Sequence, residues 1–231
     1  YWHNKAQQVL QLRQQEWLVG ASLGEGQSFS SVLPAQPRLA LTDDAIDQQR
    51  QQLQRAAQQL ALRIDRPLPP LAVTATASAA QPWSDLLSYQ PGQLSINPAQ
   101  LQQLTEAQLS ALTVRQGLAQ HWLTFGATSA ANSTPLASPA SQQGWQAYVA
   151  RLLLYRDPSW RRAVVLAGLN DACLAAVDTG LHALGWSPQQ AQQFLAQQCN
   201  LSEQQQQQWI LAIQDQPGRA IAAFAGLQGW Q

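Results

Sequence analysis

Apolar residues recur every three or four positions along most of this chain, a spacing that places them on one face of an α-helix. The first such segment, residues 4–20, is expected to bury Val9, Leu10, Leu12, Trp17 and Leu18. A glycine-rich stretch follows it and ends the helix. A second helix is predicted to start after Thr42, a good N-cap. Its expected buried stripe consists of Ile46, Leu53, Ala57, Leu60 and Ile64.

The proline-rich segment 66–70 ends that second helix, because proline lacks a backbone donor. Residues 71–75 and 94–97 are predicted strands, the latter after a turn at Pro91–Gly92. The periodic pattern then predicts helices at about residues 98–104, 105–125, 139–156, 159–183, 187–198, 202–214 and 217–228. The chain is therefore predicted to be mainly α, with a small antiparallel β element.

Three segments are expected along the chain. They are an N-terminal helical segment (1–66), a proline-rich linker with short strands (67–98) and a helical core (99–231), together forming one compact unit. No apolar run is predicted to be long enough to cross a bilayer. The chain begins at Tyr1 and contains no methionine, so we expect a processed or trimmed product whose missing upstream segment held a signal or membrane tether.

Composition excludes some classes of function. Charged residues are only 11% of the chain, against about 25% in an average protein, and the formal net charge is zero. The pattern has no basic stripe along a predicted element, which argues against nucleic-acid binding. The sequence also lacks the glycine-rich turns of serine hydrolases and of phosphate-binding loops.

The most specific string in the chain is Val177-Asp178-Thr179-Gly180-Leu181-His182-Ala183-Leu184-Gly185-Trp186. It resembles the VDTGxHxxGW signature of the domain-of-unknown-function 885 family, bacterial proteins that look like zinc metallopeptidases and are often exported or lipidated. Residues 143–148 resemble the family's EGWALY motif, and residues 217–220 resemble its PGQA motif. Residues 114–123 occupy the place of its HExxPGHH helix. The resemblance runs from about residue 90 to the end and implies a zincin-like helical fold.

Carried over residue by residue, the resemblance implies that the metal site is degenerate. Arg115 stands where the family has its first histidine, and Gln116 stands where it has the catalytic glutamate. His121 survives, Trp122 replaces the last histidine, and Gln143 replaces the glutamate of EGW. Arginine is a permanent cation that cannot bind zinc, and glutamine cannot serve as a base near neutral pH. A catalytic zinc needs about three protein ligands, so the ancestral zinc is expected to be lost.

Each residue of this vestigial site has more than one reading. His121 is either a former ligand or a hydrogen-bonded histidine lining a pocket without metal. Asp178 and His182 lie four positions apart on one helix face, which suits a metal, an Asp–His hydrogen bond, or an aspartate that accepts backbone donors. Arg115 either pairs with Asp178 or faces solvent. Trp145 is expected to pack in the core.

The two cysteines lie at similar heights on a predicted helical hairpin whose turn is Gly185–Trp186. Cys173 precedes the turn by about twelve residues and Cys199 follows it by about fourteen, at about 1.5 Å of rise each. A disulfide forms only if both residues face the seam or if the chain bends inward at Cys199. Two buried thiols are the alternative.

The sequence as a whole favours a catalytically inactive pseudopeptidase of the periplasm or cell envelope that binds or scaffolds a protein or peptide ligand, with no cofactor. One rival hypothesis is an active metal-dependent peptidase with an altered site, or one completed by a partner chain. Another is a structural module of a membrane-anchored assembly.

Overall fold

The computed structural model describes most of the chain, namely residues 1–20, 43–64, 68–75, 87–97, 106–125, 138–156, 158–199, 201 and 203–230. These residues confirm a mainly α fold with a small β element. The predicted helix 98–104, the N-cap Thr42 and residues 66–67 of the proline-rich segment lie outside them.

Two compact units make up the chain, and both are discontinuous in sequence. The disulfide unit comprises Tyr1–Ala35, Ser138–Gly144 and Val165–Gln231, and the sheet unit comprises Gln36–Ala137 and Trp145–Val164. The boundaries of these units differ from those of the three segments expected from the sequence, because two helices each contribute residues to both units.

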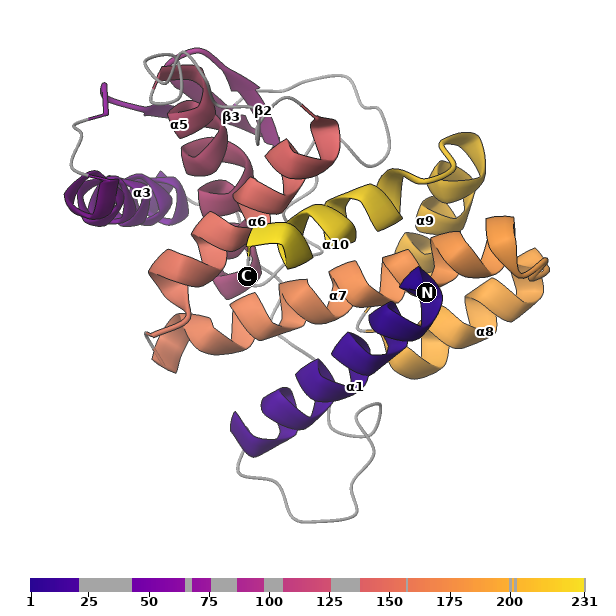
Figure 1. Cartoon of the computed structure of the whole chain (residues 1–231). Coiled ribbons are helices and arrows are strands. Elements are labelled where there is room, and N and C mark those ends of the chain that lie inside the picture. The colour runs from indigo at the N-terminus through magenta and orange to yellow at the C-terminus, as the bar shows by residue number, and fades with distance from the viewer. Residues whose placement is uncertain are drawn as a thin grey trace. The chain divides into compact units, whose positions relative to one another are not determined.

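The disulfide unit is entirely helical in its described part (Figure 1). Its elements are α1 (Trp2–Gly20), the first turns of α6 (Pro139–Leu154), most of α7 (Pro158–Ala183), α8 (Pro188–Gln198), α9 (Glu203–Asp215) and α10 (Arg219–Trp230). The turn before α8 is fixed locally: the Ser187 side chain accepts a hydrogen bond from the Gln190 backbone, and the Gln190 side chain accepts one from the Ser187 backbone. This reciprocal capping satisfies two backbone donors that would otherwise lack partners.

The central helix α7 supplies the core of the disulfide unit. Residues 172–177 are all buried, whichever way they face around the helix. Residues 160–183 are also long and apolar enough to cross a membrane, which corrects the expectation that no such run exists. Because 67% of the most apolar window is buried within the structure, a core helix accounts for this composition.

Helix α1 packs on this unit through Ala6, Leu10 and Trp17, all of which are buried. Leu12 was expected on the buried side but is 61% exposed. The spacing explains the difference: positions 6, 10 and 17 share one helix face, whereas position 12 is rotated about 200° from position 10.

The sheet unit contains three short strands, β1 (Ala72–Ala75), β2 (Leu87–Gln90) and β3 (Gln93–Ile96), in the order β1-β3-β2. Strands β2 and β3 form an antiparallel hairpin around Pro91–Gly92, where Gly92 takes a φ of 83°. Strand β1 pairs with β3 in parallel, so the sheet is mixed and not purely antiparallel as expected. Because β1 and β3 are not adjacent in the sequence, their register cannot be deduced from the local pattern.

One long helical run packs against this sheet. It consists of α4 (Glu106–Leu112), the π-helical segment η2 (Thr113–Leu118) and α5 (Ala119–Phe125), in place of the regular helix predicted for 105–125. Helix α3 (Asp43–Ile64) packs on both β1 and η2, with Leu53 and Leu60 buried. An added Cβ at Gly117 would lie 2.6 Å from the Leu94 side chain, so this glycine allows η2 to approach β3 closely.

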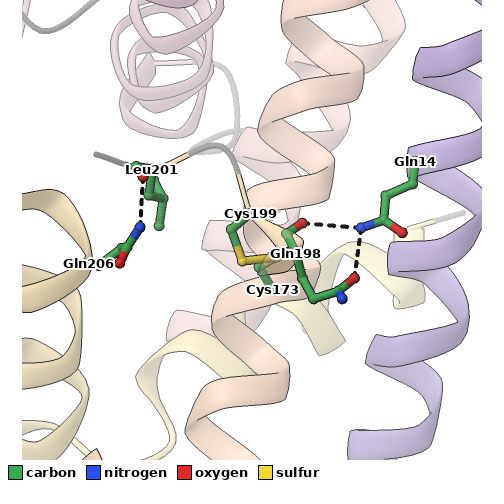
Figure 2. Close-up of a disulfide and its surroundings, with 6 residues drawn as sticks. All are labelled: Gln14, Cys173, Gln198, Cys199, Leu201 and Gln206. Atoms are coloured by element: carbon green, nitrogen blue, oxygen red, sulfur yellow. Dashed lines mark hydrogen bonds between the residues drawn. A yellow bond between two sulfur atoms is a disulfide. The ribbon is translucent and has the colours of Figure 1, made fainter. Parts of the chain in front are cut away.

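A disulfide joins Cys173 of α7 to Cys199 at the end of α8, with the Cα atoms 6.1 Å apart (Figure 2). Cys199 leaves helical geometry with φ −119° and ψ 152°, so the chain bends at the position where a bridge requires it. Beside the bridge, the Gln14 amide of α1 donates to the backbone and side-chain oxygens of Gln198, at 3.2 and 3.0 Å. The bridge and this amide thus attach the end of α8 to both α7 and α1.

Helix α10 lies unusually close to the start of α6. An added Cβ at Gly144 would lie 2.1 Å from the backbone of Gly226, and one at Gly226 would lie 1.9 Å from the carbonyl oxygen of Ala140. The Trp230 indole donates to the Ser141 carbonyl oxygen at 3.1 Å, further along the same contact. Because backbone faces backbone here, no side-chain rearrangement can make room for a methyl group.

We therefore expect Gly226→Ala to lower the free energy of unfolding by about 2 kcal/mol or more, through overpacking against a backbone. Gly229→Ala on the same helix is the matched control, because nothing lies within 4 Å of its added Cβ. That control should be neutral or stabilise the protein by up to about 1 kcal/mol. Urea denaturation of both variants measures the difference, and equal stabilities would contradict the close helix contact.

The disulfide predicts that no thiol reacts with an alkylating reagent in denaturant until a reductant is added, and that two react afterwards. Replacing both cysteines by alanine should cost about 3 kcal/mol of stability, given the sequence separation of 26 residues between them. Intact mass under non-reducing conditions checks the first part. Two rapidly alkylated thiols without reductant would show that the bridge is absent.

Candidate functional site

The residues of the predicted vestigial site fall into both units. The sheet unit contains Arg115, Gln116, His121, Trp122 and Trp145, and the disulfide unit contains Gln143, Asp178 and His182. The proposed pairing of Arg115 with Asp178 would join the two units and stays a prediction. Within each unit the contacts of these residues are well defined.

His121 is completely buried, and both of its ring nitrogens are engaged. Nδ1 lies 3.0 Å from the Tyr89 hydroxyl of β2, and Nε2 lies 2.8 Å from the carbonyl oxygen of Pro69. The rings of Tyr89 and Phe125 meet the imidazole edge to face, with centroids 6.0 and 4.8 Å away. His121 therefore connects α5 to β2 and to the chain just before β1.

These partners determine the tautomer of a neutral His121. A carbonyl oxygen can only accept a hydrogen bond, so Nε2 must carry a proton and donate to Pro69. Nδ1 then accepts from the Tyr89 hydroxyl. Neither nitrogen keeps a lone pair available for a metal ion unless one of these hydrogen bonds breaks.

Trp122, the next residue of α5, belongs to a second aromatic group. Its ring centroid lies 4.4 Å from that of Trp145, and Trp145 in turn lies 5.9 Å from Tyr148. The Trp122 indole Nε1 is buried and has no hydrogen-bond partner in the described part of the chain. Trp145 is buried, as expected from its apolar helical context. Beside this group, the Gln146 amide donates to the Gln120 side-chain oxygen at 2.7 Å.

Arg115 and Gln116 lie on the π-helical segment η2, where Arg115 is half-buried and Gln116 is exposed. π-Helical turns are rare and recur at functional sites, because the inserted residue changes which side chains share a face. At these two positions, which the sequence resemblance predicted for the ligand and the base of a zinc site, the chain has a cation and a neutral amide.

Asp178 has the best defined role of the predicted residues. It is 2% exposed, and its carboxylate accepts three backbone hydrogen bonds. Gly218 donates to Oδ1 at 3.0 Å, while Ala220 and Ile221 donate to Oδ2 at 3.0 and 3.1 Å. Ala220 and Ile221 lie in the first turn of α10 and Gly218 directly precedes it, where N–H groups have no partner within the helix. A buried carboxylate at this point also interacts favourably with the helix dipole.

His182 does not form a hydrogen bond with Asp178. Its Nε2 lies 3.9 Å from Asp178 Oδ1, beyond hydrogen-bonding distance, and 3.0 Å from the carbonyl oxygen of Ile213. Nε2 therefore donates to the end of α9. Of the alternatives for this pair, the structure contains the aspartate that accepts backbone donors.

Other residues of the same string also hold helices in place. An added Cβ at Gly180 would lie 2.3 Å from the Trp186 ring, so glycine is required for that ring to pack on α7. Gly185 takes a φ of 69° and reverses the chain after α7. The Thr179 hydroxyl lies 2.9 Å from His3 Nδ1 of α1. Each of these positions serves the packing of the disulfide unit.

The partners of His121 were missed from the sequence. Leu87 and Tyr89 alternate with the polar Ser88 and Gln90 directly before the Pro91–Gly92 turn, and this two-residue period was the available signal for β2. Nothing local indicates that Pro69 would accept from a histidine 52 positions later. Among the residues that the structure describes, no group of three His, Cys, Asp or Glu side chains is placed to hold a metal ion.

The fold and these contacts define a class of mainly helical protein. In it, residues of the string 177–186 hold the helices of the disulfide unit together. The chain belongs to the family described as bacterial protein of unknown function (DUF885), whose model matches residues 18–231. This confirms the resemblance at the level of the family. No curated protein matches the chain.

Two solved structures have a similar fold. One is "the putative lipoprotein from Colwellia psychrerythraea", with a TM-score of 0.79, 19% identity, and 97% of this chain and 43% of that chain covered. The other is "a putative lipoprotein of unknown function from Shewanella oneidensis", with a TM-score of 0.74, 15% identity, and coverage of 98% and 48%. This chain therefore spans less than half the length of either, and at these identities the likeness shows the fold alone.

The capping role predicts that Asp178→Ala lowers the free energy of unfolding by about 3 kcal/mol, because three backbone donors lose a charged acceptor. Asp215→Ala, an exposed carboxylate in the same unit, is the matched control and should change stability by less than about 0.5 kcal/mol. Urea denaturation followed by tryptophan fluorescence compares the two. A loss no larger than the control would mean that Asp178 does not stabilise α10.

Proposed function

We propose that this chain is a catalytically inactive member of its family that binds or scaffolds another protein or peptide in the cell envelope. The observation that carries the proposal is the state of His121, whose two ring nitrogens are both held by other parts of the protein. His121 is the residue that the family resemblance leaves as a metal ligand, and its ring is committed to packing.

The residues at the other ligand positions do not fit zinc. Arg115 would repel a divalent cation, and the neutral amide of Gln143 is a far weaker ligand than a carboxylate. Gln116 cannot accept a proton from a bound water near neutral pH. No catalytic step is therefore assigned to a metal in this chain.

Two observations support an envelope location: the similarity in fold to two solved structures described as putative lipoproteins, and the buried disulfide. Disulfides persist mainly in oxidising compartments such as the periplasm and are rare in the cytosol.

This proposal predicts far less than one zinc per chain after purification at neutral pH in zinc-supplemented medium, and no peptidase activity. Elemental analysis and a mixed-peptide cleavage assay measure the two quantities. His3→Ala serves as the control for His121→Ala, because His3 lies on α1 and is not part of the predicted vestigial site.

About one zinc per chain, with zinc and cleavage lost in His121→Ala but retained in His3→Ala, would contradict the proposal. That result would favour an active peptidase with an altered metal site. Cleavage that appears only when a second protein is added would favour a site completed by a partner chain.

A further inference from the structure

Positive charge is concentrated where α6 meets α7. Arg151, Arg156, Arg161 and Arg162 fall within twelve residues of a chain with thirteen basic residues and no net charge. From residue 107 to residue 170 the sequence contains a single acidic residue, Asp157. We call the four arginines the arginine corner. All of them belong to the sheet unit.

A tyrosine ring holds two of these charges close together. The guanidinium groups of Arg151 and Arg161 lie 4.8 and 5.3 Å from the centre of the Tyr155 ring. Arg161 also donates from Nε to the Tyr155 carbonyl oxygen at 2.9 Å. The two like charges are therefore within about one Debye length, which is about 10 Å at 0.1 M salt. An anion at this point would be attracted by both charges.

The corner is accessible and carries aromatic groups. Arg156, Arg161 and Arg162 are exposed. The neighbouring Tyr155 and Trp160 side chains are half-buried. Arginine forks bind phosphate oxygens in pairs, and tyrosine and tryptophan prefer the boundary between lipid and water. An acidic protein surface would match the same residues, so the choice of a lipid surface follows from the envelope location proposed above.

We propose that the arginine corner binds the phosphate headgroups of an anionic lipid surface. This inference rests on the envelope location proposed above. It gives the sheet unit a membrane-facing surface through peripheral contact, without insertion of a helix. It does not depend on the absence of zinc or of peptidase activity. A failure of lipid binding can therefore be distinguished from a failure of the proposed catalytic inactivity.

The test is flotation of the whole chain with vesicles of phosphatidylcholine alone or mixed with phosphatidylglycerol. We expect binding only to the mixed vesicles, and its loss at about 1 M salt, where the Debye length is about 3 Å. The double variant Arg156→Gln/Arg162→Gln should weaken partitioning roughly thirtyfold, because each arginine near an anionic surface contributes about a factor of five. It spares the two arginines that contact Tyr155.

The matched control is Arg50→Gln/Arg55→Gln, which removes the same charge from the exposed side of α3 in the same unit. It should bind as the unchanged protein does, and circular dichroism should show both variants folded. Equal loss in both variants would mean that net charge, not the corner, drives binding, and would overturn the proposal.

Three further outcomes would also overturn it. One is no binding to phosphatidylglycerol vesicles. Another is complete competition by millimolar inorganic phosphate, which would indicate a site for a free anion. The third is tighter binding of polyglutamate than of vesicles, which would indicate an acidic protein partner.

Discussion

The arrangement of the disulfide unit depends on the hydrogen bonds that the Asp178 carboxylate accepts from the backbone at the start of α10. A helix usually begins with a side chain of its own that caps the first turn, but α10 begins at Arg219 directly after Pro217–Gly218, which offers no such side chain. Its first donors are met by an aspartate 40 to 43 positions earlier on α7. The same helix can then lie backbone to backbone against α6, because glycines occupy positions 144 and 226. Capping fixes the start of α10 and glycine contact fixes its middle.

This arrangement gives the family signature a physical meaning that is independent of catalysis. Asp178, Gly180 and Gly185 come from one motif, Gly144 from a second and Gly218 from a third. Asp178, Gly144 and Gly218 close contacts between segments that are distant in sequence, whereas Gly180 and Gly185 form the end of α7 and its turn to Trp186. A chain that has lost its metal site, as proposed for this one, can therefore keep these motifs, since their loss would cost the fold. His121 likewise stabilises the fold independently of catalysis, because it links α5 to β2 through Tyr89.

Sequence pattern predicted those parts of the fold that depend on local periodicity. The helical hairpin at Gly185–Trp186, the starts of α3 and α10 and the strand at residues 72–75 follow from caps, turns and apolar spacing. The pattern could not supply the pairing of β1 with β3, the π-helical segment or the hydrogen bond from His121 to Pro69, because each depends on residues far apart in the chain. Leu12 shows the related limit that an apolar residue near a stripe need not belong to its face. For the candidate site, residue chemistry identified Asp178, but only the structure identifies its partners.

Hydrogen exchange at the backbone amides of Gly218, Ala220 and Ile221 tests the capping interaction most directly. First-turn amides of a helix normally exchange fast because they lack intrahelical partners. The structure predicts that these three are protected in the unchanged protein, equally with zinc or with a chelator, and that Asp178→Ala removes the protection while the middle of α7 stays protected. Fast exchange at all three amides in the unchanged protein, or protection that appears only when zinc is added, would contradict the claim that this aspartate holds α10 in place.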